Sequence, residues 1–275
     1  MTMSGSSHGS TWPAPRVPSV LTTVKWPKRP GCRSPNFANG SMVAPCVRTA
    51  SLWCFLVSTP RDLGVMNAGA FLFLSIAVVI AVLDWLAVSI GNRFMEYIFK
   101  PLTMVALVCV AMSIDPSSES ARWLMLIGLL LSMAGDIFLM LPSDLFVPGL
   151  ASFLLAHILY VVALAALGVS LGGVVMGLVV AVVAALVVGR RIVDGAAAAD
   201  RALRIPVIAY MGAISAMVTF AFGTAVFFAI VGALLFFISD AVLGWTRFVS
   251  QFSRSRQLVM VTYHLGQMGL VLALI

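Results

Sequence analysis

Eight apolar runs, each about as long as a bilayer is thick, limit what this chain can fold into. They cover residues 68–90, 97–114, 121–141, 145–168, 171–189, 203–222, 225–246 and 257–275. A helix of about 20 apolar residues spans a hydrocarbon core. Backbone groups in lipid must be satisfied within each segment, and no alternating β-barrel pattern appears. The sequence therefore predicts an all-α fold, a polytopic membrane helical bundle of about eight transmembrane helices.

The composition agrees with a protein embedded in lipid. Hydrophobic residues make up 61% of the 275 residues and charged residues only 10%, whereas a soluble domain carries roughly 25% charged residues. The connections between the apolar runs are too short to hold a soluble domain. We expect an integral, multi-pass protein of a bacterial plasma membrane, with one transmembrane domain over residues 66–275.

Residues 1–65 have a different composition. They hold seven Lys or Arg against one acid, Asp62, together with most of the prolines. This predicts a disordered, basic, Pro- and Ser-rich leader, and it lacks the apolar core of a signal peptide. Met66 stands directly before the first apolar run, so the alternative is that translation starts there and the upstream segment is a mis-assigned start.

The cysteines and histidines do not predict a metal site. Cys32, Cys46 and Cys54 lie in the leader without metal-ligand spacing, and Cys109 is alone in an apolar run. The histidines lack zinc-ligand spacing as well. We expect no metal and no cofactor.

Basic residues of the transmembrane domain indicate its orientation. Six of the seven net positive charges come from the leader, and the remaining chain has ten basic groups against nine acids, so we expect no nucleic-acid partner. Only Arg122 lies on one side of the predicted bundle. The other nine lie on the opposite side: Arg93, Lys100, Arg190, Arg191, Arg201, Arg204, Arg247, Arg254 and Arg256. The positive-inside rule makes that side cytoplasmic, including the predicted long basic loops at 190–204 and 247–256.

Two aspartates inside apolar runs, Asp136 and Asp240, are the strongest indication of function, because an ionisable group at bilayer depth is costly. At 1.5 Å rise per residue both lie roughly 8 Å inside the cytoplasmic ends of their spans. Other polar side chains reach similar depths: Asp84, Lys100, Tyr210, Tyr263 and His264, with His157 and Tyr160 deeper on one helix face. We interpret this layer as a cavity that opens to the inner leaflet.

Simpler interpretations of these residues stay open. The two aspartates can form structural ion pairs with Lys100 or a histidine, and Lys100 can instead snorkel to the interface. Asp84, followed by Trp85 near the end of a span, is interpreted as interfacial. A last group fits ordinary packing or backbone hydrogen bonding: Ser132, His157, Tyr160, Tyr210 and Ser239.

Six motifs follow one another in the transmembrane domain. They read KPLTM (100–104), SMAGDIFLML (132–141), FLLAHILY (153–160), YMGAISAM (210–217), GALLFFISDAVLGWTRF (232–248) and VTYHLGQ (261–267). Their order and placement resemble the YhhN family of integral membrane proteins, which includes the lysoplasmalogenases. The resemblance covers roughly residues 68–275. It departs at His264, where an aromatic residue is more usual, and near Trp245, where a polar residue is more usual.

The resemblance implies a membrane hydrolase that cleaves the vinyl ether bond of lysoplasmalogens, so the expected partner is a lysophospholipid taken from the bilayer. By position it places seven residues in the site: Lys100, Asp136, His157, Tyr160, Tyr210, Asp240 and Tyr263. A vinyl ether opens when its β-carbon is protonated, which gives an oxocarbenium ion that water captures. Two carboxyl groups can divide the acid and charge-stabilising roles, as in glycosidases. We therefore expect Asp136 and Asp240 to be catalytic and the other residues, with His264, to bind or orient substrate and water.

Functions from other classes remain as alternatives. A proton-coupled transporter also uses intramembrane acids, but it predicts internal symmetry with broken helices, and the first and last four spans show no convincing repeat. A lipid-binding or structural membrane protein is a second alternative. A third keeps the enzyme fold and changes the substrate.

Overall fold

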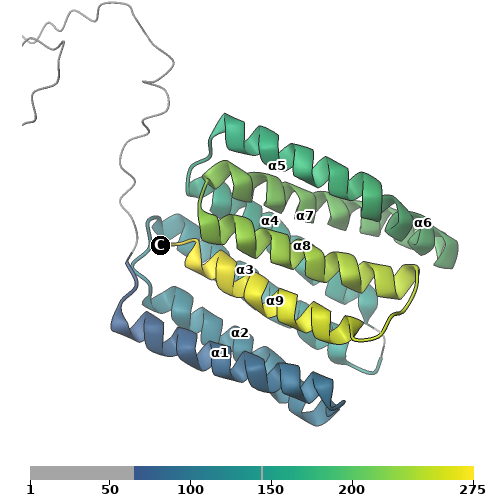
Figure 1. The fold of residues 1–275 in the computed structure, drawn as a ribbon, viewed down its shortest axis with the longest axis horizontal. Coiled ribbons are helices and arrows are strands. Elements are labelled where there is room, and N and C mark those ends of the chain that lie inside the picture. Colours follow the sequence, from purple (N-terminus) through teal and green to yellow (C-terminus); the bar gives the residue numbers. More distant parts are fainter. Residues whose placement is uncertain (1–64, 144) are drawn as a thin grey trace, which may run out of the picture. The chain divides into compact units, whose positions relative to one another are not determined.

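The computed structural model describes residues 65–143 and 145–275, and this part of the chain is helical (Figure 1). The predicted leader lies outside the described residues. The helices are α1 (Ala68–Ser89), α2 (Arg93–Ser113), α3 (Glu119–Met140), α4 (Phe146–Ala166), α5 (Leu171–Ala184), α6 (Arg190–Ala199), α7 (Arg204–Thr224), α8 (Phe227–Phe248) and α9 (Ser255–Leu272). A π-helical turn at Ala185–Gly189 joins α5 to α6, and a 3-10 turn at Arg201–Leu203 precedes α7.

The predicted all-α membrane bundle is confirmed. Seven helical segments of the described chain are long and apolar enough to cross a membrane. The predicted eighth span corresponds to α9, which is not among those seven because its polar residues, such as Arg256, His264 and Gln267, lower its hydropathy. Most of α9 is buried against α8, α1, α2 and α3. A helix inside the bundle needs less apolar surface than one that faces lipid.

The segment after residue 189 differs from the prediction. Residues 190–199 are not a loop but continue the preceding helix through the π-helical turn, so that Leu171–Ala199 forms one segment of 29 residues. Alanine and arginine are strong helix formers, and four consecutive alanines end α6. Since about 20 residues span the hydrocarbon core, this segment is long enough for α6 to extend past it.

Neighbouring helices pack as antiparallel hairpins, chiefly α1 with α2, α3 with α4, and α8 with α9, while α7 packs on both α4 and α5 (Figure 1). One large hydrophobic core runs through the bundle. The approach of α8 to α9 is closest at glycines: a Cβ atom built on Gly232 would lie 2.7 Å from the backbone nitrogen of Leu270. Close contact of these two backbones fixes the depth of Asp240 relative to Tyr263.

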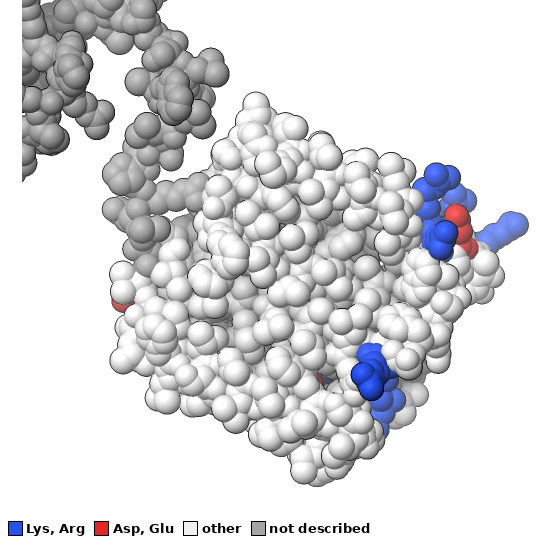
Figure 2. Space-filling model, in the orientation of Figure 1, with Lys and Arg blue, Asp and Glu red and all other residues white. Residues whose placement is uncertain are grey.

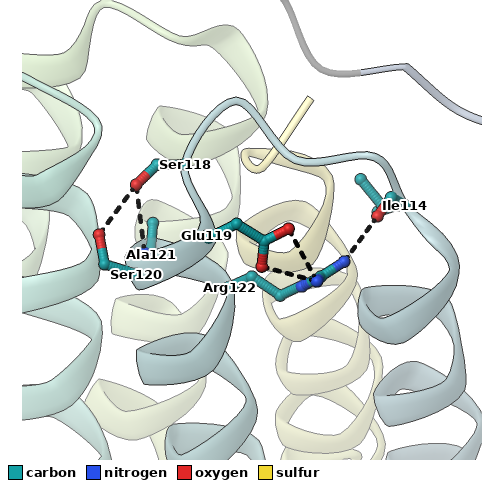
Figure 3. Close-up of polar contacts among 6 residues, drawn as sticks. All are labelled: Ile114, Ser118, Glu119, Ser120, Ala121 and Arg122. Atoms are coloured by element: carbon teal, nitrogen blue, oxygen red, sulfur yellow. Dashed lines mark hydrogen bonds and ion pairs between the residues drawn. The ribbon is translucent and has the colours of Figure 1, made fainter. Parts of the chain in front are cut away.

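Charges are distributed unequally between the two ends of the bundle. Basic side chains gather at the end that holds α6 and the start of α9 (Figure 2). At the other end, Arg122 is neutralised by Glu119, with Nη2 to oxygen distances of 2.6 and 2.8 Å, and its Nη1 donates to the carbonyl of Ile114 (Figure 3). Ser118 caps α3 there by accepting from the amide of Ala121. The basic end is therefore where the unbalanced charge lies.

Candidate active site

A buried polar cavity lies among α2, α3, α4, α8 and α9, toward the basic end of the bundle. Its volume is about 150 Å³. Both intramembrane aspartates line it, together with Lys100 and Tyr263. The remaining lining residues are Arg93, Glu96, Leu139, Met140, Phe153, Ser239, Leu243, Thr246, Ser255, Arg256, Val259 and Met260. Side chains from five helices thus meet at one depth.

Asp136 is held by a cation and a hydroxyl from two other helices. Its Oδ1 lies 2.8 Å from the Nζ of Lys100 on α2, and its Oδ2 accepts a 2.6 Å hydrogen bond from the hydroxyl of Tyr263 on α9. Lys100 is 4% exposed and points inward, so it does not snorkel to the interface. Both oxygens of the Asp136 carboxyl group therefore have a partner, one an ammonium and the other a phenol.

Asp240 has different partners. Its Oδ2 accepts a short hydrogen bond from the hydroxyl of Tyr210 on α7, and Nε2 of His157 on α4 lies 3.6 Å from the same oxygen. His157 Nδ1 lies 2.6 Å from the carbonyl oxygen of Phe153, which can only accept, so Nδ1 carries a hydrogen. Among the described residues, Asp240 has no Lys or Arg within ion-pair distance. The two carboxyl groups share a cavity and differ in charge environment.

Four of the predicted site residues do not line this cavity: His157 and Tyr210 stand behind Asp240, and Tyr160 and His264 contact other residues. Tyr160 donates a 2.9 Å hydrogen bond to Oε1 of Gln267 and lies 3.1 Å from the hydroxyl of Ser132. His264 accepts a 3.1 Å hydrogen bond at Nδ1 from the indole of Trp85 and stacks on that ring. Both contacts can orient neighbouring site residues, but neither side chain reaches the cavity.

The sequence analysis missed an ion-pair network at the mouth of the cavity. Glu96, only 4% exposed, bonds Arg256 at 2.6 Å and lies 3.8 Å from Arg93. A signal was present, because Glu96 precedes Lys100 by one helical turn and residues at this spacing share a helix face. In the sequence, Arg93 and Arg256 indicate only the orientation of the bundle in the membrane. They also line the site.

Asp84 is not interfacial, contrary to the prediction. It is fully buried on α1, and neither carboxyl oxygen has a hydrogen-bond partner among the described residues. The indole N–H of Trp85, which follows it, donates to His264 within the bundle. Hydropathy alone could not reveal that Asp84 is buried. An aspartate near the end of a span has the same local sequence whether its side chain faces outward or into the bundle.

A second, apolar cavity of about 40 Å³ lies on the other side of Asp240. It shares Leu139, Phe153, Asp240 and Leu243 with the polar cavity. The rest of its wall comes from α4, α6, α7 and α8: Phe146, Leu150, Ile192, Val207, Tyr210, Met211, Gly244 and Phe248. Asp240 and Tyr210 are the polar groups of this wall, so a carboxyl group separates a polar from an apolar compartment.

Among residues 65–143 and 145–275, no three His, Cys, Asp or Glu side chains are grouped so that they could hold a metal ion. The polar side chains that line the cavity carry carboxyl, ammonium, guanidinium, phenol and aliphatic hydroxyl groups. Such a set can donate and accept protons and can stabilise a charge of either sign.

Comparisons with known proteins agree with the motifs. The profile of the YhhN family matches residues 95–274. The protein named Lysoplasmalogenase of Mycobacterium tuberculosis is 35% identical over 165 residues, which are 58% of this chain and 62% of that protein. The uncharacterized membrane protein YhhN of Escherichia coli O6:H1 is 32% identical over 81 residues, 28% of this chain and 38% of the relative.

These alignments thus span less than two thirds of either relative. No solved structure matches the chain. The match to the family profile covers well over half of the 275 residues and includes every predicted site residue. The chain belongs to the YhhN family.

Proposed function

We propose that this protein is a membrane hydrolase that cleaves the vinyl ether bond of lysoplasmalogens, releasing a fatty aldehyde and a glycerophospho-alcohol. The observation that carries the proposal is the pair of buried carboxyl groups in one cavity, of which only Asp136 has a lysine partner. The relative named Lysoplasmalogenase supports the same reaction. Vinyl ether hydrolysis needs an acid and a negative charge close together, and this pair supplies both.

The two carboxyl groups take different roles in this proposal. The ammonium of Lys100, 2.8 Å away, keeps Asp136 as a carboxylate. Asp240 has a phenol donor and a histidine but no such cation, so it is the group that holds a proton in the buried site. Asp240 is therefore the general acid, and Asp136 stabilises the cation and orients water.

The proposed reaction begins when Asp240 transfers its proton to the β-carbon of the vinyl ether and becomes a carboxylate. The electron pair of the double bond forms the new C–H bond, and the positive charge is shared by the α-carbon and the ether oxygen. Water then attacks the α-carbon and returns a proton to Asp240. The hemiacetal collapses by moving its hydroxyl proton to the ether oxygen, which breaks the C–O bond and gives aldehyde and alcohol without net proton uptake.

The two compartments beside Asp240 suit the two halves of such a substrate. The apolar cavity, which ends at Asp240 and Tyr210, fits the start of an alkenyl chain. At about 40 Å³ it has room for little more than its first carbons, and the rest of the chain lies between helices or in lipid. The polar cavity, with Lys100 and Arg256 in its wall, fits the glycerol end.

The aspartates provide the first test. We expect Asp136→Asn and Asp240→Asn each to reduce aldehyde release from lysoplasmalogen by at least about 100-fold, because an amide neither donates the catalytic proton nor carries charge. Tyr263→Phe and His157→Ala should have smaller effects if these residues only orient their carboxyl partners. Asp194→Asn, at an exposed position of α6, is the matched control.

Aldehyde is measured with purified full-length protein, and size-exclusion profiles show that each variant is folded. A folded Asp240→Asn variant with wild-type turnover would refute the acid assignment. A wild-type protein that releases no aldehyde from any of several lysoplasmalogens would refute the reaction and favour the transporter or lipid-binding alternatives.

A further inference from the structure

A larger cavity, not used by the chemistry above, lies at the basic end of the bundle. Its volume is about 630 Å³, and the connection between α8 and α9 forms much of its wall. Three arginines line it, Arg247, Arg254 and Arg256, and none of its lining residues is acidic. The other polar lining residues are Thr246, Gln251, Ser255 and Gln257. This wall is rich in hydrogen-bond donors and in positive charge.

This outer cavity adjoins the carboxyl cavity. Leu243, Thr246, Ser255 and Arg256 belong to the walls of both. Arg256 stands at the junction, where it bonds the buried Glu96 while its side chain remains about half exposed. A molecule with an anionic group in the outer cavity can therefore place another part beside Asp136 and Asp240.

The arginines come from separate points of the cavity wall. Arg247 lies in the last turn of α8, and its guanidinium carbon lies 4.9 Å from the ring centre of Phe146. Arg254 has a φ of +62°, a conformation that is uncommon for a residue other than glycine, and it stands directly before α9 without forming a side-chain cap. Arg256 lies in the first turn of α9. Guanidinium groups match phosphate geometry particularly well.

We propose that this arginine-lined cavity binds the phosphate group of a lysophospholipid and so holds the glycerol backbone with its ether bond beside the two aspartates. This assignment rests on the proposed function for what happens at the ether bond, but phosphate binding itself requires no reaction. Recognition lies in the phosphate, so a lipid that lacks it binds weakly even when its hydrocarbon chain is the same.

Binding is measured with an ether lipid that cannot be cleaved. A 1-O-alkyl lysophospholipid has a saturated ether and no vinyl group, and 1-O-alkylglycerol is the same molecule without the phosphate. We expect the full-length protein in detergent to bind the phosphate-bearing lipid about 10-fold or more tightly than the alkylglycerol, as judged by titration of tryptophan fluorescence, because charge-assisted hydrogen bonds are strong.

Arg254 is the residue to change, because Arg256→Gln would also remove the hydrogen-bonded partner of the buried Glu96 and leave it only the more distant Arg93. Arg254→Gln should weaken binding of the phospholipid about 10-fold and leave binding of the alkylglycerol unchanged. Arg254→Lys, which keeps the charge, should retain most of the affinity. Arg201→Gln is the matched control, since Arg201 is exposed at the same end of the bundle and does not line the cavity.

Equal affinity of the wild type for the two lipids would overturn the inference, as would an Arg254→Gln variant with undiminished phospholipid binding. Inorganic phosphate that competes as tightly as the lipid would assign the cavity to free phosphate instead. If the phospholipid binds through Arg254 but its vinyl ether analogue is not cleaved, the proposed reaction is wrong and the phosphate site stands.

Discussion

The ion pair of Lys100 with Asp136 joins the stability of the fold to the chemistry of the site. Both side chains are at least 95% buried, and they come from different helices, α2 and α3. Burying a charge is costly unless an opposite charge and hydrogen bonds compensate it. Two roles of the lysine can be separated by mutation: it is the ion-pair partner of Asp136 in the folded protein, and in the proposed reaction it keeps that group ionised.

Replacing one partner should cost more stability than replacing both. Lys100→Met leaves Asp136 buried without a cation, so we expect its melting temperature in detergent to fall by about 10 °C. In Lys100→Met/Asp136→Asn no charge is left uncompensated, and most of the loss should be recovered while aldehyde release stays absent. Thermal unfolding of the wild type, the single variant and the double variant measures this.

Arg190→Met, which removes an exposed charge of α6, is the control for the loss of a basic group. A double variant that melts as low as the single one would show that the charge balance of the pair does not account for the stability. A double variant that regains activity would remove Asp136 from the mechanism.

For single residues, the sequence predicted which side chains share a layer of the bundle better than it predicted the direction in which each side chain points. The rise of a helix places Asp136, Asp240 and Tyr263 in one layer, and all three line one cavity. The same rise cannot tell which way a side chain faces in a bundle whose packing is unknown. Tyr160 and His264 contact Gln267 and Trp85 and do not line the cavity.

Among the helices, α8 and α9 approach each other closely at glycines, and this contact sets the position of Asp240 relative to Tyr263. A Cβ built on Gly269 would lie 2.6 Å from Cα of Gly232, and one built on Gly266 would lie 2.8 Å from the backbone nitrogen of Phe236. Small residues allow helix backbones to approach in this way within membranes. No larger side chain fits without moving one helix.

Glycines on α7 and α8 should therefore respond differently to the same substitution. Gly232→Ala should destabilise the protein by about 1–3 kcal/mol and reduce turnover, because the added methyl forces α8 away from α9. Gly212→Ala is the matched control, since nothing lies within 4 Å of a Cβ there, and alanine favours helix over glycine. Chemical or thermal unfolding of both variants, together with aldehyde release, measures the effect.

An unchanged melting temperature in Gly232→Ala would show that this contact can relax at little cost. Loss of activity in Gly212→Ala would show instead that substitution of any helical glycine impairs the protein. Close packing of α8 on α9 would then not explain the effect of Gly232→Ala.

The helices themselves were predicted to within a few residues, because hydropathy directly reports which segments lipid can solvate. Hydropathy was less informative for helices that face water or the interior of the bundle. The extension through α6 is amphipathic, with Ile192 and Ala196 packed against Val207 and arginines outside. The interior helix α9 is less apolar than the other spans, and its buried face carries Tyr263.

For the whole molecule, the unequal charge of the two ends predicts the leaflet from which the proposed substrate enters the site. The carboxyl cavity and the arginine-lined cavity both lie toward the basic end, whereas Arg122 at the other end is paired with Glu119. A positive end is retained in the cytoplasm when a multi-pass protein is inserted. The expected orientation, the expected side of access to the site and the proposed phosphate contacts thus all rest on one charge distribution.

We therefore expect the α8–α9 connection to face the cytoplasm. In a background with Cys32, Cys46, Cys54 and Cys109 replaced, Ser253→Cys should be labelled by a membrane-impermeant maleimide only after the cells are permeabilised. Leu171→Cys begins α5 at the opposite end and is 80% exposed, so it should react in intact cells and serves as the matched control. The reverse pattern would place both cavities at the outer leaflet. The proposed substrate would then have to come from the outer leaflet. The arginines would lie outside the cell, contrary to the positive-inside rule.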